Sequence, residues 1–182
     1  MKISFDVPDE FPLTALACVA LSFQCFIMAF LIVVPARYKY FSNEHMKTHF
    51  AKEHAVAFPG QRAPIMGFPD AGSGRFSESL SYKDWISFNN ANRAHLNIFE
   101  QLHFLIPTIL VSALFLPTLT LYAAWAGVFS RAAYVIGYVI YGPNARMLGA
   151  FFNLIPVYGL LAYSMYVMGK HVATNGLIFI TA

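Results

Sequence analysis

Charged residues are scarce in this chain of 182 residues, since Asp, Glu, Lys and Arg together make up only 12% of it. An ordinary soluble domain has roughly 25% charged residues. Hydrophobic residues make up 58% of the sequence and aromatic residues 16%. This composition excludes an ordinary soluble protein and predicts an integral membrane protein in contact with membrane lipids. The formal net charge of +3 suits an anionic membrane surface and gives no reason to expect a nucleic-acid partner.

Cysteine is also scarce, with only Cys18 and Cys25 in the whole sequence. They lie seven residues apart on one predicted helix, where the two thiols cannot meet to form a disulfide. We interpret both as packing residues of an apolar helix. The N-terminal segment lacks the basic region and the small-residue cleavage site of a signal peptide, so we expect a retained membrane anchor.

The sequence contains long hydrophobic runs. The longest extends from Phe104 to Tyr141, too far for a single crossing of about 20 residues, and Pro117 lies where a turn would divide it. The predicted fold is an all-α integral membrane protein, a bundle of four transmembrane helices in a single domain. The expected spans are about 13–34, 92–116, 119–141 and 148–169.

A long polar segment, about 37–90, separates the first two predicted spans. Lysine and arginine gather in this segment and near Arg146, so the positive-inside rule places both loops in the cytosol and both chain ends in the lumen. The stretch FPGQRAPIMGFPDAGSGRFS, at 58–77, is expected to be an irregular loop because Pro and Gly are scattered through it. The histidines of SNEHMKTHFAKEHA are typical of a solvated helix, and we expect no metal site there.

A polar stripe opens the second predicted span. Arg93, Asn97 and Glu100 are spaced i, i+4 and i+7, which stacks their side chains on one helix face. Ionisable groups at the edge of hydrocarbon normally face the interior of a bundle or a wet cavity, where they are paired. His95 is turned away from this face, so we expect it to contact a neighbouring helix.

A second stripe lies on the third predicted span. Arg131, Tyr134 and Tyr138 follow the spacing i, i+3 and i+7. The two stripes are expected to face each other, with Glu100 and Arg131 as buried opposite charges. One interpretation is purely structural: the two polar faces hold the helices together and bind no ligand.

Two further arginines are predicted at the same cytosolic end. Arg37 leaves the first span and Arg146 follows the third. Guanidinium groups present rigid forks to carboxylates, and Glu100 can accept a cation. The stripes and these arginines would therefore also suit a small polyanion that carries an ammonium group.

The two stripes lie in segments that resemble the signature of a known family. RAHLNIFE, at 93–100, resembles the pattern R-A-H-x-N-x-x-E of the membrane-associated proteins in eicosanoid and glutathione metabolism. RAAYVIGYVIYGPNARMLGA, at 131–150, looks like the R-x-x-Y-x-x-G-Y segment of that family with the following G-x-P-x-x-R-x-x-G-A. The motif spacing is most similar to that of the type-three microsomal glutathione S-transferases, and PARYKYF, at 35–41, echoes the exit of their first span.

The resemblance implies four-helix subunits that assemble as a homotrimer, with glutathione as a co-substrate held between neighbouring subunits. An endoplasmic reticulum or mitochondrial membrane would be the location. Arg146 matches the arginine that helps to hold glutathione or activate its thiol, and Arg37 corresponds to the arginine that ends the first helix. The residues that match glutathione-binding positions are Arg93, Asn97, Glu100, Arg131, Tyr134 and Tyr138.

The implied activity is a membrane-bound glutathione transferase or peroxidase. A cation beside glutathione would stabilise its thiolate, which would attack a lipophilic electrophile or a lipid hydroperoxide. Two alternatives stay open. One is a structural subunit or scaffold that joins other subunits of a larger membrane complex, and the other is a lipid-binding regulatory protein.

Overall fold

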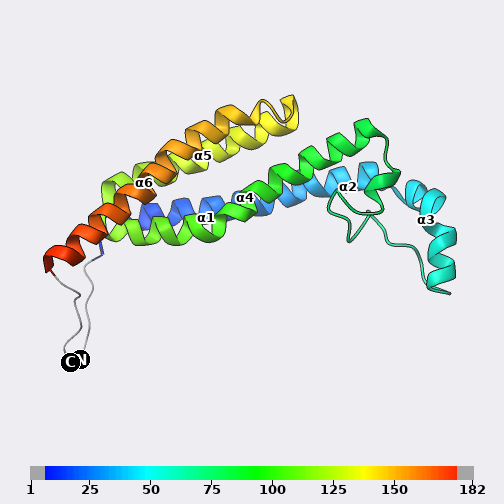
Figure 1. Cartoon of the computed structure of the whole chain (residues 1–182), viewed down its shortest axis with the longest axis horizontal. Coiled ribbons are helices and arrows are strands. Elements are labelled where there is room, and N and C mark those ends of the chain that lie inside the picture. The colour runs from blue at the N-terminus through cyan, green and yellow to red at the C-terminus, as the bar shows by residue number, and fades with distance from the viewer. Residues whose placement is uncertain (1–6, 176–182) are drawn as a thin grey trace.

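The computed structural model describes residues 7–175, except for the side chains of 146, 148–149, 152–156 and 175. All regular elements in this part of the chain are helical (Figure 1). The first rod consists of α1 (Phe11–Met28), a π-helical turn η1 (Ala29–Val33) and α2 (Val34–Tyr40). The other elements are α3 (Asn43–Ala57), a 3-10 turn η2 (Ser77–Ser79), α4 (Tyr82–Phe115), α5 (Pro117–Tyr141) and α6 (Arg146–Asn175).

Local chemistry explains several helix boundaries. Proline lacks an N–H group and its ring clashes with the carbonyl group four residues earlier, and the π-helical turn η1 comes just before Pro35. The hydroxyl group of Ser81 caps α4 by accepting a hydrogen bond from the backbone of Asp84 at 3.2 Å. Leu116 leaves the helical conformation and α5 begins at Pro117, where the sequence predicts the turn.

Three helices of the described residues are long and apolar enough to cross a membrane. They are Phe11–Tyr40, Tyr82–Phe115 and Pro117–Tyr141. Together with the composition, they make the chain an integral membrane protein. The fourth predicted span falls within α6, and its membrane crossing stays a prediction.

The helical body is organised around α5. This helix packs against α6 in an antiparallel hairpin, and α1 and α4 lie against both α5 and each other (Figure 1). Ala17 and Ala124 are fully buried in the core, and small side chains of this kind let helix backbones approach closely. The core formed by α1, α4, α5 and α6 contains Ala17, Cys18, Leu21, Leu105, Ile109, Ala124, Val128 and Val157.

The polar segment is more helical than a loop of 37–90 would be. The first rod continues to Tyr40, α3 occupies much of the segment, and α4 begins at Tyr82 (Figure 1). Serine caps at Ser42 and Ser81 start the two polar helices. A hydropathy criterion detects only the apolar part of such helices, so α4 begins at Tyr82, before the predicted span of about 92–116. The irregular stretch predicted at 58–77 is confirmed.

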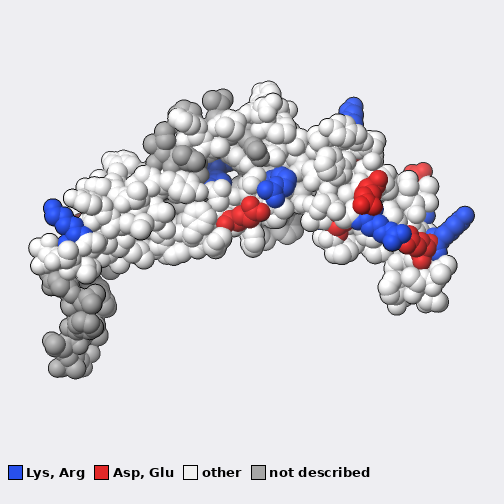
Figure 2. All heavy atoms as spheres, viewed as in Figure 1, with Lys and Arg blue, Asp and Glu red and all other residues white. Residues whose placement is uncertain are grey.

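The projecting end of the molecule carries most of the charge. The rod α1–α2 and the first half of α4 extend past the turn between α5 and α6, and α3 lies at the far end (Figure 1). Figure 2 shows charged side chains gathered over this end, whereas the visible surface of the helical body is mostly uncharged. This distribution fits an apolar body in the bilayer and a polar extension in water.

The membrane topology can be tested with two epitope tags. In sealed vesicles with the cytosolic face outward, a tag inserted at the exposed Gly60 should be cleaved by added protease. A tag after Ala182 should be protected until detergent opens the vesicles, because the Lys and Arg bias places the chain ends in the lumen. Equal cleavage of both tags in sealed vesicles would contradict this topology.

Candidate functional site

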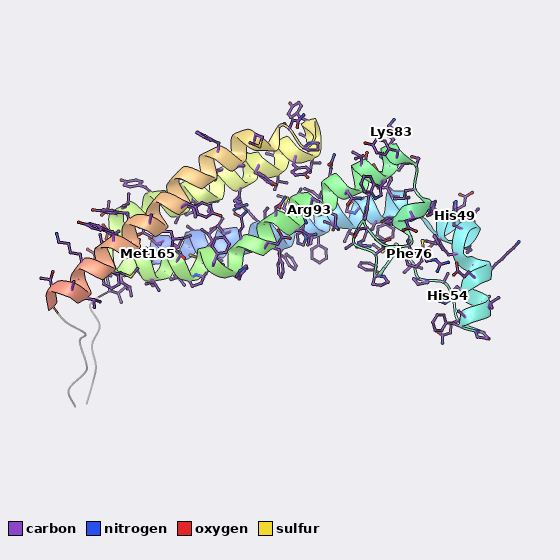
Figure 3. All side chains as sticks on the ribbon, viewed as in Figure 1. His49, His54, Phe76, Lys83, Arg93 and Met165 are labelled. Carbon is purple, nitrogen blue, oxygen red and sulfur yellow. The ribbon has the colours of Figure 1, made fainter. Side chains whose placement is uncertain are left out.

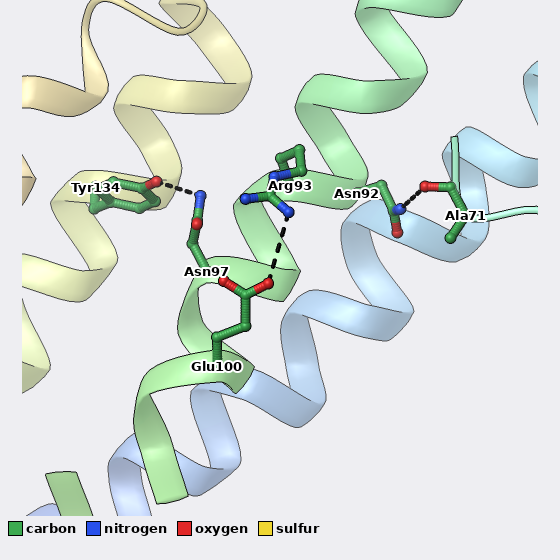
Figure 4. A network of polar contacts seen from close by, with 6 residues as sticks. All are labelled: Ala71, Asn92, Arg93, Asn97, Glu100 and Tyr134. Carbon is green, nitrogen blue, oxygen red and sulfur yellow. Dashed lines mark hydrogen bonds and ion pairs between the residues drawn. The ribbon is translucent and has the colours of Figure 1, made fainter. Parts of the chain in front are cut away.

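The stripe on α4 carries a charged pair on the surface of the helix. A nitrogen of Arg93 lies 3.6 Å from a carboxylate oxygen of Glu100, and the side chains are 48% and 53% exposed (Figure 4). Both residues belong to a helix that is apolar enough to span the bilayer. The pair lies near the start of the predicted span 92–116, and an exposed ionic pair at the edge of hydrocarbon is expensive, so we expect a further surface or ligand to cover it.

The stripe on α5 is buried against the other helices. Arg131, Tyr134 and Tyr138 are 4%, 6% and 5% exposed. The amide nitrogen of Asn97 donates a hydrogen bond of 2.6 Å to the hydroxyl oxygen of Tyr134 (Figure 4). The two stripes therefore meet at this bond, which joins α4 to α5.

The expected pairing of Glu100 with Arg131 is wrong for the described residues. Glu100 pairs with Arg93 on its own helix, because i and i+7 lie two turns apart on one face. Arg131 is buried, and one of its terminal nitrogens has no hydrogen-bond partner among the side chains and backbone that the structure describes. A buried donor without a partner costs about 1–3 kcal/mol, which makes this nitrogen a candidate contact for an anionic ligand group.

His95 contacts the first helix, as the sequence predicts. Its Nε2 atom lies 3.7 Å from the Sγ atom of Cys25 on α1. Cys25 packs in one cluster with Tyr134, Tyr138, Ala94 and Ile98. The cluster holds α1, α4 and α5 together beside the polar stripes.

Arg37 is engaged by the loop that follows α3. Its guanidinium donates to the backbone oxygens of Met66 at 3.1 Å and Asp70 at 2.6 Å, and it lies 4.1 Å from the ring centre of Phe68. The side chain is 6% exposed. None of these contacts involves a stripe residue, so within the described residues Arg37 anchors the loop.

Arg146 begins α6, directly after the turn that follows α5. Its side chain lies outside the described residues, so the thiolate-activating role stays a prediction. The described residues contain no group of three or more His, Cys, Asp or Glu that could hold a metal ion.

Three residues on the first half of α4 hold the loop that follows α3, and the sequence alone did not identify them. The side chains of Trp85 and Asn89 each donate to the carbonyl oxygen of Gly72 at 2.9 Å. The side chain of Asn92 donates to the carbonyl oxygen of Ala71 (Figure 4). Gly72 has a positive φ of 109°, and a Cβ atom there would clash with Asn89. The spacing of Trp85, Asn89 and Asn92, i, i+4 and i+7, places them on one helix face and could have predicted a shared contact.

The carboxylate of Asp70 organises the same loop. It accepts hydrogen bonds from the backbone nitrogens of Gly72 at 2.7 Å, Gly74 at 2.9 Å and Ser77 at 2.6 Å. Burial acts to raise the pKa of Asp70, but these hydrogen bonds outweigh it and lower the pKa from its ordinary value of 3.8. The loop is therefore folded around one ionised carboxylate.

Replacing Asp70 with alanine should lower the free energy of local opening of the loop by about 1–3 kcal/mol, because buried N–H groups lose their acceptor. Hydrogen exchange of the amides at 66–77 measures the effect. Glu78→Ala is the matched control, since Glu78 is an exposed acid of the same segment. Unchanged exchange in Asp70→Ala would contradict this role.

The same carboxylate predicts the response of the loop to acid. Because the folded pKa of Asp70 is lowered, its stabilising contribution is complete above the ordinary pKa of 3.8 and is lost as the pH falls through the lowered value. Exchange of the loop amides, corrected for the intrinsic pH dependence of exchange, should therefore accelerate only below about pH 4. In Asp70→Asn this acid-induced acceleration should be absent.

Comparison with known proteins gives one match. The family model described as "MAPEG family" matches residues 14–166. No curated protein and no solved structure matches the chain. The matched residues include α4 and α5 and with them both polar stripes, as well as the start of α6. Because the family model covers well over half of the sequence, the chain belongs to the MAPEG family, the membrane-associated proteins in eicosanoid and glutathione metabolism.

Proposed function

We propose that this protein is a membrane-bound glutathione transferase or peroxidase of the type-three microsomal kind. The MAPEG family includes glutathione transferases and peroxidases, which use glutathione. The observation that carries the proposal is the meeting of the two stripes at Asn97 and Tyr134, with a buried nitrogen of Arg131 that no described residue engages in a hydrogen bond. An endoplasmic reticulum or mitochondrial membrane is the proposed location.

The residues of the stripes suit the groups of glutathione. This tripeptide carries two carboxylates, one ammonium group and one thiol. Arg93 and Arg131 would bind carboxylates, which match the fork of a guanidinium, and Glu100 would bind the ammonium group. Asn97, Tyr134 and Tyr138 would supply neutral hydrogen bonds.

The chemistry requires a thiolate. A free thiol has a pKa near 8.5, so a nearby cation is needed to favour the ionised form at neutral pH. We assign this role to Arg146, because the contacts of Arg37 are with the loop. The thiolate would attack the electrophilic carbon of an aryl halide and form a thioether as the halide ion leaves. With a lipid hydroperoxide it would attack the terminal oxygen and break the O–O bond, which gives the sulfenic acid of glutathione and, after protonation, the lipid alcohol. A second glutathione would then condense with the sulfenic acid to give the disulfide and water.

A homotrimer would complete the site. Arg93 and Glu100 are half exposed on a helix that is suited to the bilayer, and a neighbouring copy of the chain would cover them. Lipophilic substrates would then enter sideways from the membrane. Chemical crosslinking of the purified protein tests the trimer.

A titration of the purified protein with glutathione tests the central proposal. We expect saturable binding by calorimetry, an ultraviolet thiolate signal, and turnover with an aryl halide or a lipid hydroperoxide. Binding without thiolate or turnover would remove the enzymatic part of the proposal. The absence of binding would remove the glutathione site altogether.

The second candidate function is a scaffold subunit of a larger membrane complex. The projecting end formed by α2, α3 and the start of α4 favours it, because the anchored loop offers a preformed surface to a partner (Figure 1). Co-purification with other membrane subunits, together with an inert protein in the titration, is the expected result for that function.

A further inference from the structure

Two cavities that share lining residues lie where the first membrane helix ends. One has a volume of about 380 Å³ and lies between the first rod, α4 and Val139 of α5. The other has a volume of about 340 Å³ and lies at the junction of α2, α3 and the start of α4. Lys39 and Tyr40 line both cavities. Figure 3 labels His49 on α3, which lines the second cavity, and Lys83 near the start of α4.

The first cavity is apolar on its inner side. Leu31, Ile32 and Val139 belong to helices that are suited to the bilayer. Its polar lining residues are Lys39, Tyr40, Ser87 and Asn90. Small-molecule sites have this composition of an apolar wall with a few polar groups, and they occupy about 300–1,000 Å³. The cavity therefore suits an acyl chain with its polar end toward α3.

The second cavity is polar. It is lined by Lys39, Tyr40, Ser42, His45, His49, Ser79, Leu80, Ser81 and Asp84. The formally charged members are one lysine and one aspartate. Burial lowers the pKa of His45, and its Nε2 atom lies 2.8 Å from the hydroxyl group of Ser79. Lys39 and Asp84 are therefore the formally charged groups that a ligand in this cavity would meet.

Both charged groups retain binding capacity. Lys39 makes no ion pair with any described residue; its ammonium lies 4.9 Å from the ring centre of Tyr40. One carboxylate oxygen of Asp84 accepts a hydrogen bond of 2.7 Å from Ser81, and no described hydrogen bond engages the other oxygen. A cation and a carboxylate in one polar cavity complement a ligand that carries both a phosphate and an ammonium group.

We propose that these two cavities, which share Lys39 and Tyr40, together bind one glycerophospholipid with a phosphoethanolamine headgroup. The phosphate lies against Lys39, the primary ammonium donates to Asp84, and an acyl chain occupies the cavity beside Ile32 and Val139. A fatty acid would leave Asp84 without a partner. A phosphocholine headgroup cannot donate a hydrogen bond to the carboxylate, because its nitrogen carries three methyl groups.

The test uses the full-length protein in mixed micelles and native mass spectrometry. The two probes are dioleoyl phosphatidylethanolamine and dioleoyl phosphatidylcholine, which share their acyl chains. We expect the wild type to retain the ethanolamine lipid about tenfold better than the choline lipid, because one charge-assisted hydrogen bond usually contributes about this factor. Equal retention of the two lipids would overturn the assignment of the headgroup.

Two variants and a matched control separate the contributions. Lys39→Gln should lower retention of both lipids about tenfold, because both carry the phosphate. Asp84→Asn should retain both lipids but lose the preference between them. Lys83→Gln, which removes a neighbouring lysine that does not line either cavity, should behave as wild type. Identical behaviour of all three variants would overturn the proposal.

Soluble glycerophosphoethanolamine distinguishes a lipid from a free headgroup. We expect it to displace the lipid poorly, because it has no acyl chain for the apolar cavity. Displacement at concentrations similar to those of the lipid would overturn the proposal of a lipid site. The measurement contains no glutathione, so its outcome is independent of the proposed catalytic function.

Discussion

Replacing Arg131 with alanine should weaken glutathione binding by about 2–5 kcal/mol, the usual cost of removing one partner from a buried, hydrogen-bonded charge pair. Arg131 is 4% exposed, and one of its terminal nitrogens has no hydrogen-bond partner among the described residues. An anionic group of glutathione would supply the missing acceptor. Calorimetric titration of wild type and variant measures the loss directly.

The controls for this prediction separate binding from folding. Arg131→Lys keeps the charge but loses the planar fork, so its affinity should lie between those of wild type and Arg131→Ala. Arg62→Ala removes an exposed loop arginine and should bind as wild type. Thermal unfolding without glutathione shows whether each variant is folded. Wild-type affinity in a folded Arg131→Ala would exclude this arginine from the site.

Replacing Arg146 with alanine should lower turnover by about 10²-fold while much of the glutathione binding is retained. A positioned cation stabilises the thiolate more than the thiol, so its loss should also raise the apparent pKa of the bound thiol. The pH dependence of the thiolate absorbance measures this pKa. Turnover is measured with a lipid hydroperoxide and with an aryl halide.

The matched variants are Arg146→Lys and Arg37→Ala. Arg146→Lys should recover part of the turnover, because a cation remains at the start of α6. Arg37→Ala should loosen the loop, since Arg37 donates hydrogen bonds to Met66 and Asp70. Wild-type turnover in Arg146→Ala, or a larger loss of turnover in a folded Arg37→Ala, would contradict the assignment. An inert wild type in complex with partners would favour the scaffold function.

Much of the fold follows from the sequence, because membrane physics leaves few options. A chain with so little charge and such long apolar runs has to satisfy its backbone hydrogen bonds within helices. Pro117 marks a turn in the sequence and begins α5 in the structure. The spacing of Arg93, Asn97 and Glu100 likewise fixes them on one helix face, because the helical repeat is a local property.

The partners of those side chains depended on tertiary packing. Sequence spacing can align Glu100 with either its own helix or a neighbour, and in the structure it pairs with Arg93. Arg37 could have joined the polar stripes, but the folded loop brings the carbonyls of Met66 and Asp70 to its guanidinium. Contacts of this kind join residues about thirty positions apart, and no local pattern specifies them.

The sequence by itself determined that the protein is a helical membrane protein with two polar stripes and the signature of its family. Hydropathy, helical periodicity and motif spacing are all local properties, which is why they can be read without a structure. Only the tertiary structure decided that Asn97 meets Tyr134, that a buried nitrogen of Arg131 has no partner among the described residues, and that Lys39 lines two cavities. These features depend on how helices far apart in the chain pack, and packing is a property of the whole fold.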